Sequence, residues 1–370
     1  MRKKITVFGT RGIPDVLGGV ETHCQHLYPE IKRLCDVDIC VIARSPYVNY
    51  TRSSYKNVET HALWAPRKRS LEAIVHSVLA AFSTCFDRST IVHVHAIGPG
   101  LVVPLLRLLG KKVVFTHHGP DYDRQKWGYV AKKILLLGER WAVRYASEVI
   151  VISEVINQLI QNKHRRYDAH LIHNGVNVPR TLSEHTLHQT LSRYGLQPKN
   201  YLVVVGRFVE EKGMHDAILA YQQSGLTMPL VLIGDADHPT GYSIRLKQQA
   251  ADTQGVVMTG FLRGDELQAV FSQAKLFVMP SYHEGLPIAL LEAMSFSLPA
   301  VVSDIPANLE VKLPADAYFQ VGNLASLAGK MARWAAANNV DYSVYLQNYN
   351  WHEIARQTVS VYHAIDKDIG

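Results

Sequence analysis

Short apolar runs alternate with amphipathic stretches along almost all of the 370-residue chain. The runs have the length of buried strands, and the stretches between them carry apolar residues at the three- and four-residue spacing of a core-facing helix. This alternation predicts βαβ units, and hence parallel sheets covered by helices. In the first half of the chain we expect strands at residues 5–9, 37–43, 91–96, 113–118 and 149–153.

The pattern breaks at a polar stretch over residues 178–199 and then begins again. The length also fits two domains, at roughly 100–200 residues per domain. We therefore predict an α/β protein with two Rossmann-like, doubly wound domains facing a cleft, at residues 1–178 and 179–347, followed by a terminal helix over 348–370. Strands of the second domain are expected at residues 201–206, 229–234, 256–260, 276–281 and 299–304.

Positive charge is concentrated in the first half of the chain. Residues 1–180 contain 26 Lys and Arg against 14 Asp and Glu, whereas residues 181–370 contain 13 against 18. A basic half favours anionic partners, such as phosphates or the surface of an anionic membrane. A basic surface kept for solubility is the alternative. We expect no nucleic-acid partner.

The cysteines and the apolar runs bear on localisation. Cys24, Cys35, Cys40 and Cys85 form no CxxC pair and lie among apolar residues. We interpret them as buried, reduced thiols of a cytoplasmic protein. The first apolar run is too short for a secretory signal, and none reaches the roughly 18 residues of a membrane span.

A glycine pair precedes the first predicted helix. Gly18 and Gly19 stand between the first strand and a helix expected from residue 21, but their loop lacks the GxGxxG spacing of dinucleotide-binding proteins. Two glycines here let backbone N–H groups approach an anion at the helix N-terminus. An ordinary glycine-containing turn is the alternative.

Two basic residues follow the first strand of the second half. Arg207 and Lys212 lie five residues apart in a turn that leads into a helix; we call residues 206–213 the Arg–Lys loop. A guanidinium offers a two-pronged contact to phosphate and an ammonium offers a mobile point charge, so together they suit a diphosphate. Alternatively, they neutralise the neighbouring Glu210 and Glu211.

Two glutamates flank the start of a later, apolar helix. Glu284 stands just before the expected helix start, where the free N–H groups of Gly285 and Leu286 can bind a phosphate or sugar oxygen. Glu292 lies two turns further on, where an unpaired carboxylate among apolar residues is costly. This Glu–Glu motif (residues 284–292) suggests hydroxyl recognition. Each glutamate taken alone also fits a helix-dipole or surface residue.

Together these segments resemble the nucleotide-sugar glycosyltransferases of the GT-B fold, specifically the large retaining family four. That family has a GGxE loop, a G-R-x(4)-K-G segment opening the second domain and an E-x(7)-E segment, matched here by residues 18–21, 206–213 and 284–292. Order and spacing match across essentially the whole chain. A bacterial, rhamnosyltransferase-like subset that builds surface polysaccharides (O-antigen or capsule) is similar at residues 11–14, 118–122 and 124–128.

The resemblance implies a retaining, metal-independent transferase whose donor is a nucleoside-diphosphate sugar and which needs no cofactor. Arg207 and Lys212 would hold the donor diphosphate, which the backbone of Gly18 and Gly19 would also approach. The nucleobase would lie at the post-strand turn formed by Gly260, Phe261 and Leu262.

The same resemblance places ribose and sugar at the Glu–Glu motif. Glu292 would hydrogen-bond the ribose, and Glu284 with the Gly285 and Leu286 amides would bind hydroxyls of the donor sugar. The strand-end histidine of the family corresponds to His118, with His117 as the near alternative. A neutral imidazole there can donate to a sugar hydroxyl and line the reacting face. His118 and Glu284 are therefore the expected catalytic residues.

The acceptor would occupy the N-terminal domain, and the C-terminal domain would bind the donor. We expect a glycan precursor linked to a polyprenyl diphosphate, and thus peripheral contact with the inner face of the plasma membrane. The terminal segment resembles the final helix of the family, which packs back on the first domain. Acceptor contacts are expected from Asp121, Arg124 and Lys126.

Three alternatives remain. A nucleotide-sugar 2-epimerase shares the fold, a sugar-nucleotide-binding protein would share the site without catalysis, and an NADP oxidoreductase could use Arg44 for a 2′-phosphate. The Arg–Lys loop disfavours the epimerase, and the absence of GxGxxG disfavours the oxidoreductase.

Overall fold

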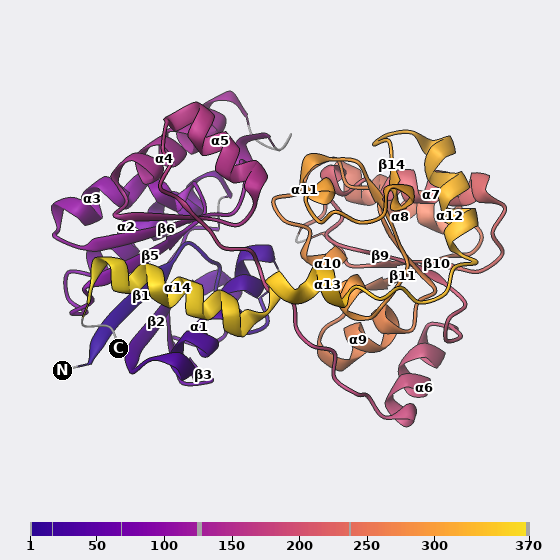
Figure 1. Ribbon diagram of the computed structural model, residues 1–370, viewed down its shortest axis with the longest axis horizontal. Helices are drawn as coiled ribbons and strands as arrows, with labels where there is room; N and C mark the ends of the chain where they lie inside the picture. Colours follow the sequence, from indigo (N-terminus) through magenta and orange to yellow (C-terminus); the bar gives the residue numbers. More distant parts are fainter. Residues whose placement is uncertain (1, 17, 68, 124–127, 237, 368–370) are drawn as a thin grey trace. The chain divides into compact units, whose positions relative to one another are not determined.

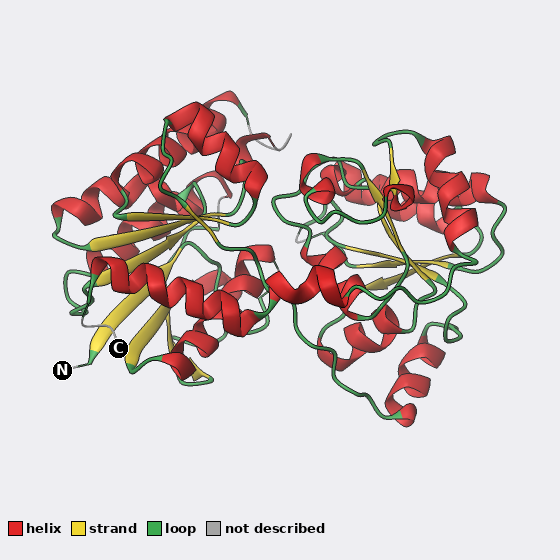
Figure 2. Cartoon of the chain, in the orientation of Figure 1, coloured by secondary structure: helices red, strands yellow, loops and turns green. Residues whose placement is uncertain are grey.

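The computed structural model describes the chain except for residues 1, 17, 68, 124–127, 237 and 368–370. The chain forms two units (Figure 1): Met1–Gly175 with Asn348–Gly370, and Val176–Gln347. Each unit contains one sheet with helices on both faces (Figure 2), which confirms the predicted class of two Rossmann-like α/β domains. Among the described residues, no helix is both long and apolar enough to cross a membrane.

The first unit is built on an eight-stranded sheet in the order β3-β4-β2-β1-β5-β6-β7-β8. The strands are β1 (Lys3–Phe8), β2 (Val37–Arg44), β3 (Arg52–Tyr55), β4 (Val58–Leu63), β5 (Ile91–His95), β6 (Lys112–His117), β7 (Glu148–Val151) and β8 (His170–Leu171). The helices are α1 (Gly19–Leu34), α2 (Arg69–Ser83), α3 (Val103–Leu108), α4 (Tyr129–Tyr145), α5 (Glu154–His164) and α14 (Trp351–Ile365). The direction of strand addition reverses between β1 and β5, the point at which such sheets bind ligands.

The second unit has a six-stranded parallel sheet in the order β11-β10-β9-β12-β13-β14. Its strands are β9 (Leu202–Val205), β10 (Leu230–Ile233), β11 (Val256–Gly260), β12 (Leu276–Met279), β13 (Ala300–Ser303) and β14 (Tyr318–Phe319). Its helices are α6 (Glu184–Arg193), α7 (Met214–Ser224), α8 (Gly241–Ala251), α9 (Gly264–Ser272), α10 (Ile288–Ser295), α11 (Pro306–Leu309), α12 (Leu324–Trp334) and α13 (Ser343–Leu346). The reversal here lies between β9 and β12.

Helix α14 completes the core of the first unit although it ends the chain. Trp351, Ile354 and Tyr362 lie in the same buried cluster as Leu27 of α1. A side chain at Gly175 would collide with this helix, because its Cβ would lie 2.4 Å from the Trp351 ring. The segment after residue 347 is therefore an integral layer of the first unit.

The sequence pattern missed one hairpin. Strands β3 and β4 pair antiparallel through a two-residue turn at Lys56 and Asn57, both with positive φ. Strand β3 contains Arg, Ser, Ser and Tyr and is largely exposed, so it carries no apolar signal. Such a short, polar strand is a common way to end a sheet, because it resists pairing with other molecules.

The expected burial of the cysteines is wrong for one of the four. Cys24, Cys35 and Cys40 are buried, but Cys85 is exposed. Its apolar neighbours Phe82 and Phe86 are themselves 50% and 88% exposed, so apolar flanks were a poor guide to burial there.

Candidate functional site

The second-unit site forms where the Arg–Lys loop follows β9 and the Glu–Glu motif follows β12. Strands β9 and β12 are parallel neighbours at the switch point, the place where the direction of strand addition reverses. Their carboxyl ends therefore bring the two segments together. The Tyr282 N–H donates to the Glu211 carbonyl at 2.8 Å, which joins the two loops directly. Segments about 70 residues apart in sequence thus make one surface, as expected for a site at a switch point.

Lys212 and Glu284 form an ion pair within this surface. Lys212 Nζ lies 2.5 Å from Glu284 Oε1, and Ser281 Oγ donates to the same oxygen at 2.7 Å. The Glu284 side chain is 9% exposed, so this contact is largely shielded from solvent. Glu284 Oε2 takes part in neither contact. Arg207, two residues after β9, is half-buried, and Gly285 and Leu286 follow Glu284 ahead of α10.

Glycine is required at Gly213. The residue has φ +62°, and a Cβ there would lie 2.1 Å from the Pro280 carbonyl oxygen. Even alanine would force the two loops apart, because a contact this short must be relieved by backbone movement. The glycine that closes the Arg–Lys loop is thus explained by close packing between the loops.

Glu292 is partly buried in α10, and its carboxylate has no hydrogen-bond partner among the described residues. Burial raises its pKa to about 7. A carboxylate in such surroundings is costly to the fold, which fits a group that a bound ligand would satisfy. The expected base-binding turn lies at the end of β11, where Gly260 has φ +72° and Phe261 is 37% exposed.

The pKa of Glu292 gives the first prediction. Because the folded-state pKa lies above the ordinary value of 4.5, folding favours the protonated acid, and stability should fall as the pH rises from about 4.5 through 7. Glu292→Gln should therefore raise the free energy of unfolding by about 1–3 kcal/mol at pH 8 and change it little at pH 4.5. Urea denaturation at both pH values measures this. Glu184→Gln, at an exposed site, is the control. An equal effect of Glu292→Gln at both pH values would contradict the shifted pKa.

In the first unit, Glu21 organises the loop that follows β1. Its Oε1 accepts hydrogen bonds from the Arg11 N–H at 2.9 Å and from the Thr10 hydroxyl at 3.4 Å. A Cβ at Gly18, which has φ +143°, would lie 2.0 Å from Glu21 Oε2. The helix α1 then begins at Gly19. The glutamate of the GGxE loop thus holds the loop itself, a role that we did not assign from the sequence.

His118 lies directly after β6, at the edge where β5 also ends, and joins a buried hydrogen-bonded cluster. His118 Nε2 lies 2.9 Å from His95 Nδ1, and the other nitrogen of His95 is hydrogen-bonded to the Tyr28 hydroxyl. The Tyr28 hydroxyl lies 3.0 Å from His93 Nδ1, which lies 2.6 Å from the Tyr362 hydroxyl of α14. The terminal helix is therefore connected to His118 through polar side chains.

The imidazoles of this cluster are neutral near pH 7. Burial, reinforced by the neighbouring histidines, lowers the pKa of His95 and His118 well below the ordinary value. With one nitrogen bound to His95, a neutral His118 has its other nitrogen left as either a hydrogen-bond donor or an acceptor. In either case, the neutral imidazole can form the predicted hydrogen bond to a sugar hydroxyl.

His23 completes a group of three histidines with His95 and His118. One ring nitrogen of each lies within 4.8 Å of the others, the spacing of potential metal ligands, and it is the one such group in the described part of the chain. His23 Nδ1 lies 2.7 Å from Asn174 Oδ1, and burial lowers the pKa of His23 to about 4. The 2.9 Å hydrogen bond between His95 and His118 accounts for their closeness without an ion.

The remaining predicted residues are placed as follows. His117 is buried and accepts from the Gly119 N–H at 3.1 Å, with its Nε2 3.9 Å from Glu139, so His118 rather than His117 contacts the cluster. Asp121 begins a short 3₁₀ helix after β6. Arg44 is held by Glu72 at 2.8 Å, which removes it from the role it would play in an NADP site. Arg124 and Lys126 lie outside the described residues.

Several residues of the site were not predicted from the sequence. His93 and His95 alternate along β5 and therefore share one face of the sheet, a two-residue spacing that could have pointed to the cluster. Tyr28 and Tyr362 carried no local signal, because their helices place them against β5 only in the folded chain.

The chain matches two families of glycosyltransferase domains. Residues 18–175 match the family described as Glycosyl transferase 4-like domain, and residues 192–350 match Glycosyl transferases group 1. The chain is 26% identical over 386 aligned positions to α-maltose-1-phosphate synthase of Mycobacterium tuberculosis, covering 95% of this chain and 97% of that protein. It is 21% identical over 182 positions to O-antigen chain mannosyltransferase B of Escherichia coli, covering 46% and 48%.

Solved structures show the same fold. Sucrose-phosphate synthase from Thermosynechococcus elongatus has a TM-score of 0.80 at 19% identity, covering 98% of this chain and 99% of that one. The Anabaena protein HepE in complex with UDP and glucose has a TM-score of 0.76 at 16% identity, covering 98% and 100%. The protein is therefore an enzyme of the GT-B glycosyltransferase class. Within that class, its N-terminal part matches the glycosyl transferase 4-like domain, and its C-terminal part matches the glycosyl transferases of group 1.

Proposed function

We propose that the protein is a retaining, metal-independent glycosyltransferase that moves a sugar from a nucleoside-diphosphate sugar to a glycan precursor. The observation that carries this proposal is the Lys212–Glu284 pair at the β9–β12 switch point. There a cation suited to a diphosphate lies 2.5 Å from a carboxylate suited to sugar hydroxyls. In a nucleoside-diphosphate sugar the diphosphate is bonded directly to the sugar, so the groups that bind the two must lie close together.

On the donor side, Arg207 and Lys212 would neutralise the charge that grows on the departing diphosphate. Such preorganised cations supply the electrostatic stabilisation that a metal ion supplies in other transferases. Glu292 would bind the ribose, which gives the unsatisfied carboxyl a partner. Gly260 and Phe261 would receive the base.

At the reacting carbon, Glu284 would orient the sugar hydroxyls while a neutral His118 bonds another hydroxyl. The acceptor hydroxyl would attack on the face from which the diphosphate leaves, and a diphosphate oxygen would take its proton. The new glycosidic bond would form as the sugar–phosphate bond breaks, so the anomeric configuration is kept. No protein nucleophile and no metal is needed for this sequence.

For the acceptor, we propose a polyprenyl-diphosphate-linked saccharide of surface polysaccharide synthesis, in the rhamnosyltransferase-like subset. The basic first half of the chain supports an anionic acceptor, and the match to an O-antigen chain mannosyltransferase supports a surface glycan. Such an acceptor implies work at the inner face of the plasma membrane by a protein that is otherwise cytoplasmic.

Proton NMR of the transfer product, formed in excess EDTA, tests the reaction. We expect the anomeric configuration of the donor sugar in the product, and a rate within about twofold of that without chelator, because cationic side chains rather than a metal meet the diphosphate charge. An inverted anomeric centre, or activity that disappears with EDTA and returns with a divalent cation, would contradict the mechanism.

A further inference from the structure

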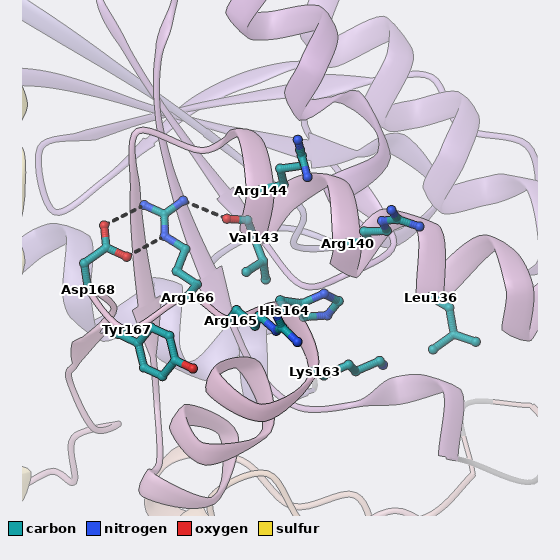
Figure 3. A pocket seen from close by; sticks show the side chains of 10 residues that line it. All are labelled: Leu136, Arg140, Val143, Arg144, Lys163, His164, Arg165, Arg166, Tyr167 and Asp168. Atoms are coloured by element: carbon teal, nitrogen blue, oxygen red, sulfur yellow. Dashed lines mark hydrogen bonds and ion pairs between the residues drawn. The ribbon is translucent and has the colours of Figure 1, made fainter.

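A basic pocket on the first unit lies outside the site described above. It has a volume of about 870 Å³ and lies between the second half of α4 and the residues that end α5 and follow it (Figure 3). Its cationic side chains come from both segments, and Asp168 is the one acidic side chain among the described residues that line it. The cations are Arg140, Arg144, Lys163, Arg165 and Arg166.

Two of these cations, Arg166 and Lys163, are bound to other groups of the protein. Arg166 donates to the Val143 carbonyl at 2.7 Å and lies 2.8 Å from Asp168, which anchors the segment after α5 to the end of α4. Lys163 lies 2.9 Å from the buried Glu139. Both therefore shape the wall of the pocket while their charges are largely compensated.

The other three cations are available to a ligand. Arg140, Arg144 and Arg165 are exposed, and none forms an ion pair within the described ranges of the chain. Arg144 does lie over the Tyr145 ring, with its guanidinium carbon 5.8 Å from the ring centre. Three uncompensated guanidinium groups around one hollow favour an anion, and phosphate above all, because each offers a planar pair of donors.

The same face of α4 carries exposed apolar side chains. Tyr129, Val130 and Leu137 are 73%, 69% and 39% exposed. At about 100° per residue they fall, together with Arg140 and Arg144, within an arc of about 100° around the helix. A helix face with this mixture of basic and apolar groups suits the interfacial layer of a membrane, where apolar groups enter and cations meet phosphates.

We propose that this face of α4, together with the pocket, is the surface by which the first unit binds an anionic membrane, and that Arg140, Arg144 and Arg165 hold a lipid phosphate. The proposal rests on the proposed function, because a lipid-linked acceptor must be met at a membrane. The exposed apolar residues beside the pocket favour a membrane over a free phosphate, since a soluble anion would gain nothing from them.

Vesicle sedimentation with the full-length protein tests this. We expect strong binding at low salt to vesicles of phosphatidylcholine with 30% phosphatidylglycerol, and weak binding to pure phosphatidylcholine. The triple variant Arg140→Gln/Arg144→Gln/Arg165→Gln should lose about 100-fold in apparent affinity, since each basic residue near the surface contributes about a factor of five. Arg52→Gln/Arg180→Gln/Arg245→Gln removes the same charge from exposed positions elsewhere and should stay within about threefold of wild type.

Two further measurements separate the alternatives. Val130→Ser/Leu137→Ser should weaken vesicle binding without changing the net charge. Unchanged binding would mean that the apolar side chains do not enter the membrane, and the proposed membrane-binding surface would then be wrong. Inorganic diphosphate serves as the soluble probe. If it stabilises wild type but not the triple variant against heat, and vesicles bind neither protein, the pocket binds a soluble phosphate and the proposal is wrong.

Nucleotide binding distinguishes a failure of the proposed membrane-binding surface from a failure of the proposed transferase function. Binding of UDP, GDP and TDP is titrated by calorimetry in all variants, because the donor site lies in the other unit. If nucleotide binding persists while wild type and the triple variant bind vesicles equally, only the membrane surface fails. If no nucleotide binds to any of them, the proposed transferase fails irrespective of the vesicles.

Discussion

His118→Ala should lower kcat by about 100-fold or more, the effect expected when one preorganised polar group is lost from a reacting site. The variant removes the imidazole that hydrogen-bonds to His95 at 2.9 Å and leaves the rest of the polar chain in place. Steady-state transfer from the nucleotide sugar measures the loss. Nucleoside-diphosphate affinity, measured by calorimetry, should stay within about twofold of wild type.

Tyr28→Phe is the matched variant for the cluster behind His118. It removes one buried hydroxyl that bonds both His93 and His95, and it changes no group expected to touch substrate. Because a buried His95 nitrogen then loses its partner, stability should fall by about 1–3 kcal/mol, and kcat should fall less than in His118→Ala. A kcat for His118→Ala within threefold of wild type would remove His118 from the reaction.

Lys212→Met and Arg207→Ala should each weaken nucleoside-diphosphate binding by about 1.5–3 kcal/mol, or roughly 10- to 150-fold. The physical reason is the loss of one charge-assisted contact to the diphosphate. Titration calorimetry measures it. Lys212→Met should also destabilise the protein, because among the described residues Glu284 then keeps only the Ser281 hydroxyl as a partner at the shared oxygen.

The double variant Lys212→Met/Glu284→Gln separates binding from folding. Replacing both charges removes the unpaired carboxylate, so part of the lost stability should return, while nucleotide affinity should stay low. Arg245→Gln, an exposed change in the same unit, is the control for lost charge. If Lys212→Met and Arg207→Ala lower stability but leave affinity unchanged, the Lys212–Glu284 pair is structural only.

Local patterns in the sequence were sufficient for ten strands of the two sheets, but not for β3, β4, β8 and β14. Buried parallel strands are short apolar runs, and their covering helices repeat apolar residues every three or four positions, so each element is visible in a window of a few residues. The loops rich in functional side chains are also local, because they follow strands directly. Arg207 and Glu284 could therefore be placed at strand ends before any strand order was known.

The strand order itself required the tertiary structure. Whether β9 lies beside β12 depends on which of several apolar strands pair, and their similar patterns do not distinguish these pairings. The contact between Lys212 and Glu284 follows from that pairing. The sequence resemblance named both residues, but the folded chain shows that they neutralise one another across two loops.

The histidine cluster and the role of the terminal helix were likewise decided only in three dimensions. Tyr362 contacts His93 across 269 residues of sequence, and Trp351 lies against Gly175. Buried polar groups must find partners wherever the fold provides them, so a single tyrosine or histidine gives no sign of its partner in advance. The sequence by itself determined most of the strands and helices and which side chains stand at their ends, because propensity and periodicity act within a few residues. The tertiary structure decided which of those ends meet, because hydrogen bonds and packing between distant segments depend on the strand order.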